Sequence, residues 1–110
     1  MANPITLVVF PASDLEAAKT FYSAFLGVEP YADSPYYVGY KVGELEIGLD
    51  PRGQQVISYI DTEDIEASIK ELVAAGAEAQ GDPKDVGGGL LVATVKDVSG
   101  NVLGLRQPVK

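Results

Sequence analysis

The sequence predicts an α+β fold in which two βαβββ modules, approximately residues 1–52 and 53–110, share one core. Hydrophobic patterns give the first reason, because a strand pattern, a helix pattern and a pair of strand patterns follow one another twice. The second reason is a repeat: the residues from Asp14 to Ala18 read DLEAA, and those from Asp64 to Ser68 read DIEAS. Such a repeat indicates two similar units, although two helix starts could also coincide by chance. A chain of 110 residues has the length of a single domain.

Each module contains one amphipathic helix. In the first, Ser13 or Asp14 can cap the helix by accepting a backbone N–H, and Gly27 can close it in the left-handed conformation. In the second, residues 61–64 offer the cap and Gly76 closes the helix. Apolar residues recur between these ends every three or four positions, which gives each helix one apolar face: Leu15, Ala18, Phe21, Tyr22, Phe25 and Leu26, then Ile65, Ile69, Leu72 and Val73.

Six segments are predicted as strands, because they are short and rich in β-branched or aromatic residues, or alternate apolar with polar side chains. Gly43 and Glu44 join two of them in a hairpin, and a polar, glycine-rich loop over residues 81–89 precedes another. The six segments are residues 5–10, 36–42, 45–50, 55–60, 90–95 and 102–106.

Composition excludes several kinds of chemistry. The chain has no histidine and no cysteine, so it lacks imidazole and thiol catalysts and the ligands that hold transition metals most tightly. The net charge is −8, and the eight basic residues are spread along the chain. Nucleic acids and anionic membranes are therefore not expected partners.

Targeting signals are not evident in the sequence. The N-terminal residues lack the basic and apolar regions of a signal peptide, and no apolar run approaches the roughly 20 residues that span a bilayer. With no cysteine to form disulfides, a reducing compartment is expected. We therefore expect a cytoplasmic protein.

Four motifs together resemble the vicinal oxygen chelate superfamily, which includes glyoxalase I, extradiol dioxygenases, methylmalonyl-CoA epimerase and the bleomycin-resistance proteins. The motifs are DLEAAKTFYSAFLG from Asp14, DTEDI from Asp61, AAGA from Ala74 and DVSGNVL from Asp97. They span nearly the whole chain in the family's order. The resemblance is specific for the fold and weak for the function, because the superfamily contains both enzymes and simple binding proteins.

The resemblance implies one domain over residues 1–110, in which the two modules form a curved, mixed β-sheet cup with helices on its outer face. It also implies a homodimer. The metal enzymes of the family place four ligands inside the cup, and by motif register these positions are Leu7, Gly48, Gln55 and Gly104. Three of them have no ligand atom, and Gln55 offers one neutral carbonyl. We therefore expect no metal and no cofactor.

Strand alternation extends this register to other residues that line the cup. It places Glu46, Gly48 and Asp50 on one face, opposite to apolar neighbours, but it does not orient the first strand, where both faces are apolar. Tyrosines and a single arginine supply flat apolar surface and polar anchors. The candidate ligand-binding residues are Leu7, Val9, Tyr37, Tyr40, Gly48, Gln55, Tyr59, Gly104 and Arg106.

Each candidate has a structural alternative. Strand propensity and core packing explain the tyrosines at 36, 37 and 40 more simply than a ligand does. Arg106 suits a surface salt bridge as well as a ligand anchor. The leading hypothesis is a metal-free protein that sequesters a small organic molecule, as bleomycin-resistance proteins do, with planar ligands suited to the tyrosines. The alternatives are a lyase or isomerase with a divergent or absent metal site, whose catalytic residues the sequence does not identify, and a partner module.

Overall fold

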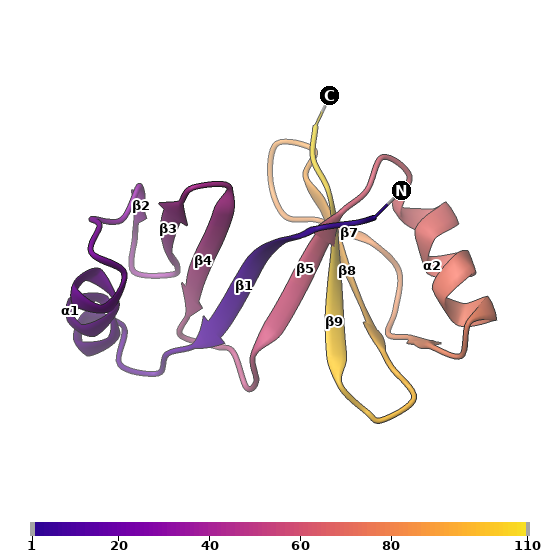
Figure 1. Cartoon of the computed structure of the whole chain (residues 1–110), viewed down its shortest axis with the longest axis horizontal. Helices are drawn as coiled ribbons and strands as arrows, with labels where there is room; N and C mark the ends of the chain where they lie inside the picture. Colours follow the sequence, from indigo (N-terminus) through magenta and orange to yellow (C-terminus); the bar gives the residue numbers. More distant parts are fainter. Residues whose placement is uncertain (1, 110) are drawn as a thin grey trace. The chain divides into compact units, whose positions relative to one another are not determined.

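The computed structural model describes residues 2–109 and has the α+β class that the sequence predicts (Figure 1). Its elements in chain order are β1 (Ile5–Pro11), α1 (Leu15–Leu26), β2 (Ala32–Asp33), β3 (Val38–Val42), β4 (Leu45–Asp50), β5 (Ile57–Asp61), α2 (Ile65–Ala74), β6 (Glu78–Ala79), β7 (Lys84–Asp85), β8 (Leu91–Lys96) and β9 (Val102–Gln107). The chain divides into two compact units. Residues 6–57 are called the N-terminal module below, and the described residues on either side of them the C-terminal module.

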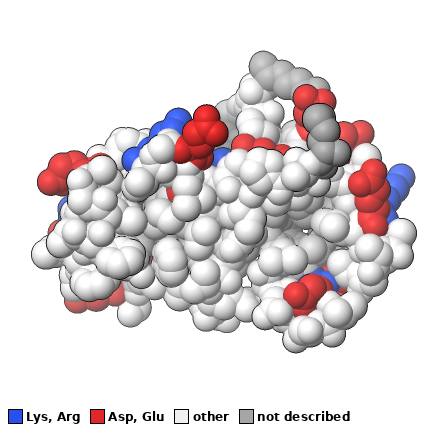
Figure 2. All heavy atoms as spheres, in the orientation of Figure 1, with Lys and Arg blue, Asp and Glu red and all other residues white. Residues whose placement is uncertain are grey.

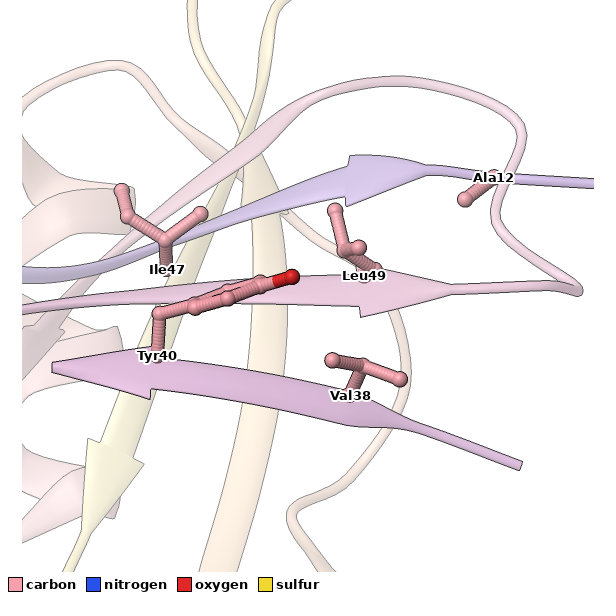
Figure 3. Packing of buried hydrophobic residues seen from close by; sticks show 5 residues of the cluster. All are labelled: Ala12, Val38, Tyr40, Ile47 and Leu49. Atoms are coloured by element: carbon pink, nitrogen blue, oxygen red, sulfur yellow. The ribbon is translucent and has the colours of Figure 1, made fainter. Parts of the chain in front are cut away.

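The N-terminal module has four strands in the order β2-β3-β4-β1. β1 runs parallel to β4, whereas β3 is antiparallel to both β4 and β2. The helix α1 packs against β3 and β4. The core of the N-terminal module consists of five buried residues, which Figure 3 shows: Ala12, Val38, Tyr40, Ile47 and Leu49.

The C-terminal module repeats this arrangement, with β5 parallel to β9 and β8 antiparallel to β9. Its edge strand is split into two pieces, because β6 and β7 both pair with β8 at different points. The helix α2 covers a core of four buried residues: Ile65, Ala93, Val95 and Leu105. Each module is therefore a βαβββ unit, with one face of its sheet covered by its own helix.

The helix ends follow the repeat that the sequence shows. Asp14 caps α1 by accepting the N–H of Ala17 at 3.1 Å, and Asp64 caps α2 by accepting the N–H of Ala67 at the same distance. Gly27 ends α1 with a φ of 72°, a conformation that glycine adopts without steric cost. The predicted helices and their N-caps are confirmed.

Some strand ends differ from the prediction. Tyr37 precedes β3, because the hydroxyl of Ser34 accepts N–H bonds from Tyr36 and Tyr37 and so forms a local turn. β5 begins at Ile57, which leaves Gln55 exposed before the strand. The sequence did not predict β2, β6 or β7 at their positions, since strands of two residues are too short to show alternation.

Within residues 2–109, neither helix has the length and apolar character that crossing a bilayer requires. On the face that Figure 2 shows, the few Lys and Arg atoms lie beside Asp and Glu and do not form a continuous stripe. A protein that follows a phosphate backbone has such a stripe.

Candidate ligand-binding faces

Each sheet has a second face that its own helix does not cover, called the helix-free face below. In the N-terminal module, Gly48 on β4 lies between Gly39 on β3 and Val9 on β1. Because Ile47 and Leu49 point into the core beside α1, the intervening Gly48 faces the other way. The predicted register of this strand is confirmed, and pairing orients β1 as well.

Two tyrosines lie over neighbouring glycines on this face. A Cβ atom on Gly48 would lie 2.6 Å from Cζ of Tyr37, so the tyrosine occupies the space of any side chain at that position. A Cβ on Gly39 would lie 3.1 Å from Cζ of Tyr31. The hydroxyl of Tyr31 donates a hydrogen bond of 2.7 Å to Oε1 of Glu46. The face therefore offers aromatic surface beside a hydrogen-bonded carboxylate.

The C-terminal module has the same relation between a tyrosine and a glycine. Tyr59 on β5 pairs with Gly104 on β9, and a Cβ on Gly104 would lie 2.7 Å from Cγ of Tyr59. Gly48 and Gly104 hold corresponding places in the two sheets, each on the strand parallel to the first strand of its module. In both modules, then, a tyrosine fills the space beside this glycine.

Arg106 forms an ion pair on the same face of the C-terminal module. Its Nε donates to Oδ1 of Asp61 at 2.8 Å, and Nη2 lies 3.4 Å from Oδ2. The arginine side chain is only 14% exposed and the aspartate side chain 36%. Of the two roles that the sequence left open for Arg106, the ion pair is present, and it partly neutralises the charge that an anionic ligand would use.

Tyr40 was expected among the ligand-binding residues, and the structure corrects this expectation. Tyr40 pairs with Ile47, points toward α1 and has no exposed surface. Its hydroxyl donates to the carbonyl oxygen of Lys19 at 3.0 Å and lies 2.9 Å from Oγ of Ser23. The cause is strand alternation: Gly39 faces away from the helix, so Val38 and Tyr40 face the core.

Other predicted residues divide between the two modules. Leu7 pairs with Glu46 and is buried on the helix-free face, two residues before Val9. The helix-free faces described above carry five more of the predicted residues: Tyr37, Gly48, Tyr59, Gly104 and Arg106. Gln55 lies outside the strands.

Sequence reasoning missed Tyr31 and Gly39. The hairpin turn could have revealed the glycine, because pairing Val42 with Leu45 also pairs Gly39 with Gly48.

Of the four positions that the family resemblance assigns to metal ligands, Gln55 alone carries a donor atom, and it lies before β5 begins. Leu7 has no donor atom, and Gly48 and Gly104 have tyrosines where a ligand side chain would project. Over residues 2–109, no three Asp, Glu, His or Cys side chains gather as a metal site requires.

The sequence model of the Glyoxalase/Bleomycin resistance protein/Dioxygenase superfamily matches residues 5–105. A search of the curated proteins found no match.

Solved structures with the same fold have low sequence identity to this chain. A hypothetical protein, BH1468 from Bacillus halodurans C-125, is 17% identical over 100% of this chain and 97% of its own, with a TM-score of 0.81. A Streptomyces coelicolor methylmalonyl-CoA epimerase variant in complex with 2-nitronate-propionyl-CoA is 17% identical over the full length of both chains, with a TM-score of 0.77. A Mn(II)-bound glyoxalase from Novosphingobium aromaticivorans is 18% identical over 96% of this chain and 38% of its own, with a TM-score of 0.72.

Proposed function

Because this chain belongs to the Glyoxalase/Bleomycin resistance protein/Dioxygenase superfamily, we propose that it is a metal-free protein that binds a small organic molecule. The two modules act as one domain, which assembles as a homodimer. The ligand contacts the tyrosine-lined, helix-free faces of the sheets. The function is of the bleomycin-resistance type, in which binding itself withholds the molecule from other targets.

One observation carries the proposal: tyrosines fill the space beside Gly48 and Gly104, the two family ligand positions on β4 and β9. A metal enzyme needs side-chain donors that project from these positions. A binding protein needs apolar surface with a few fixed polar groups, and tyrosine supplies both through its ring and its hydroxyl. The substitution pattern therefore favours binding over metal chemistry.

The charges favour a neutral or cationic ligand. Glu46 is fixed by the hydroxyl of Tyr31 and can accept a further hydrogen bond from a donor on the ligand. Arg106 is paired with Asp61, and the whole chain carries a charge of −8. Planar, weakly basic organic molecules match this combination of aromatic rings and carboxylate.

Calorimetric titration with a panel of such molecules tests the proposal, after a thermal-shift screen has selected them. We expect at least one to bind, and we expect Tyr37→Leu or Tyr59→Leu to weaken its binding at least tenfold. The matched control is Tyr36→Leu, which removes an exposed tyrosine that lies over no glycine. If no molecule in the panel binds, or if all three variants bind equally well, the proposal fails.

A second candidate is a metal-free isomerase or lyase. The observation that favours it is the hydrogen bond between Tyr31 and Glu46, since a carboxylate and a phenol in contact can take up and return a proton. A methylmalonyl-CoA epimerase variant is among the solved structures with the same fold. Exchange of a ligand C–H proton with deuterated solvent, abolished by Glu46→Gln, would support this candidate; binding without exchange supports sequestration.

A further inference from the structure

The C-terminal module contains an apolar cavity of about 160 Å³ that the proposed function does not use. Ile60, Leu72 and Leu105 line it, and these residues also pack around the core beneath α2. The cavity therefore lies on the face of the sheet that carries α2. Tyr59 and Arg106 belong to the opposite face, because side chains alternate along β5 and β9.

The helix α2 forms one wall of the cavity. α2 packs against β6, β8 and β9. Leu72 of α2 lines the cavity together with Ser58 and Ile60 of β5. At the rim, Ile5 is 53% exposed and Leu103 is 40% exposed, so the cavity opens to solvent between two aliphatic side chains.

Water is a poor occupant of this space. A stable buried water needs two to four polar partners, and among the described residues of the lining Ser58 alone has a polar side chain. The backbone of Gly104, which also borders the cavity, is engaged in pairing with Tyr59 and Thr94. The cavity thus has the volume of several waters and too few groups to bond them.

We propose that this cavity is a second binding site, specific for a small apolar molecule the size of a benzene ring or a short alkyl chain. A cavity of about 150 Å³ lined by aliphatic and aromatic side chains stays dry and takes up benzene or xenon. The present cavity has a similar volume, and its described lining is aliphatic apart from Ser58 and Gly104. Since it lies on the other face of the sheet, it does not depend on the ligand proposed above.

Methyl-resolved NMR of the full chain, titrated with benzene, tests this site. We expect saturable shifts, below the aqueous solubility of benzene, confined to methyl groups of Ile60, Leu72, Val95, Leu103 and Leu105. Ser58→Leu fills the cavity and should abolish the shifts. The matched control, Ser99→Leu, makes the same change on an exposed turn and should leave them unchanged.

A second variant covers the case in which Ser58→Leu fails to fold. Leu103→Phe enlarges a half-exposed residue at the rim and should block entry without disturbing the core. The proposal is overturned if benzene gives no saturable shifts in the wild-type chain. This holds even if the cause is a second copy of the chain that covers Leu103 and closes the cavity. It is also overturned if the folded cavity variants bind benzene as the wild type does. If the Tyr37 or Tyr59 variants lose the organic ligand, benzene should still bind in the cavity. Each proposal can therefore fail without the other.

Discussion

The ring of Tyr59 occupies the space into which any side chain at position 104 would project, with Cγ only 2.7 Å from the place of a Cβ atom. Tyr37 stands in the same relation to Gly48 in the other module. At both positions the tyrosine in its observed place therefore requires a glycine beneath it.

Adding one methyl group at either glycine should destabilise the protein. Gly104→Ala meets the ring of Tyr59 near its root and should cost about 1–3 kcal/mol in the free energy of unfolding. Gly48→Ala meets the hydroxyl end of Tyr37, which can swing aside, and should cost less. Urea denaturation measures the change. In the double variant Tyr59→Ala with Gly104→Ala the clash is absent, so its loss should be smaller than the sum of the single losses. Simple additivity would show that the ring and the glycine are not coupled.

Tyr40 should matter for stability and not for ligand binding. Tyr40→Phe removes the hydroxyl that contacts the Lys19 carbonyl and the Ser23 hydroxyl within the core. We expect a loss of about 1–2 kcal/mol, because buried hydrogen-bonding groups lose their partner. Tyr36→Phe, at a residue 71% exposed, serves as the control and should change stability little. Equal effects of the two substitutions would contradict the position assigned to Tyr40.

The two helix caps should contribute equally. Asp14 and Asp64 make equivalent hydrogen bonds at the two N-termini, so Asp14→Ala and Asp64→Ala should each cost about 1 kcal/mol. Asparagine caps as well as aspartate does, and the corresponding Asn variants should retain most of that stability. Thermal and urea unfolding of the four variants provide the comparison, and a cap whose loss has no effect would break the symmetry of the two modules.

Asp97 should make stability depend on pH in acid. The side-chain amide of Asn101, followed by its backbone N–H, holds the pKa of the Asp97 carboxyl below its ordinary value of 3.8. A lowered pKa in the folded state means that this contribution is present above pH 3.8 and is lost as the pH falls through the folded value. The stability difference between wild type and Asp97→Asn should therefore shrink below pH 3.8. A difference that stays constant from pH 6 to pH 2 would contradict the assignment.

Much of the fold could be predicted because it is encoded locally. Asp14, Asp64 and Gly27 act on the residues next to them, and the alternation around Gly48 reports which face of β4 is buried. The two-residue edge strands could not be predicted. They exist because they pair with β3 and β8, and their own sequences show no strand pattern. The sheet pairing also supplied what alternation alone could not, namely the orientation of β1.

The candidate site was predictable only in part. The absence of donors at Leu7, Gly48 and Gly104 was visible in the sequence, whereas the tyrosines over the glycines depend on side-chain directions across strands. Tyr37 lies over Gly48 and Tyr40 lies in the core. Alternation accounts for their opposite faces, since the two positions differ by three, but the turn at Ser34 that keeps Tyr37 outside β3 was not predicted.

The most direct test of the account is a titration of the chelator-treated protein with Mn²⁺, Fe²⁺, Ni²⁺ and Zn²⁺, followed by elemental analysis after gel filtration. We expect no stoichiometric metal in the wild type, because tyrosines fill the space beside Gly48 and Gly104 and Leu7 offers no donor. One tightly held metal ion per chain would contradict the account and return the protein to the metal-dependent branch of its family.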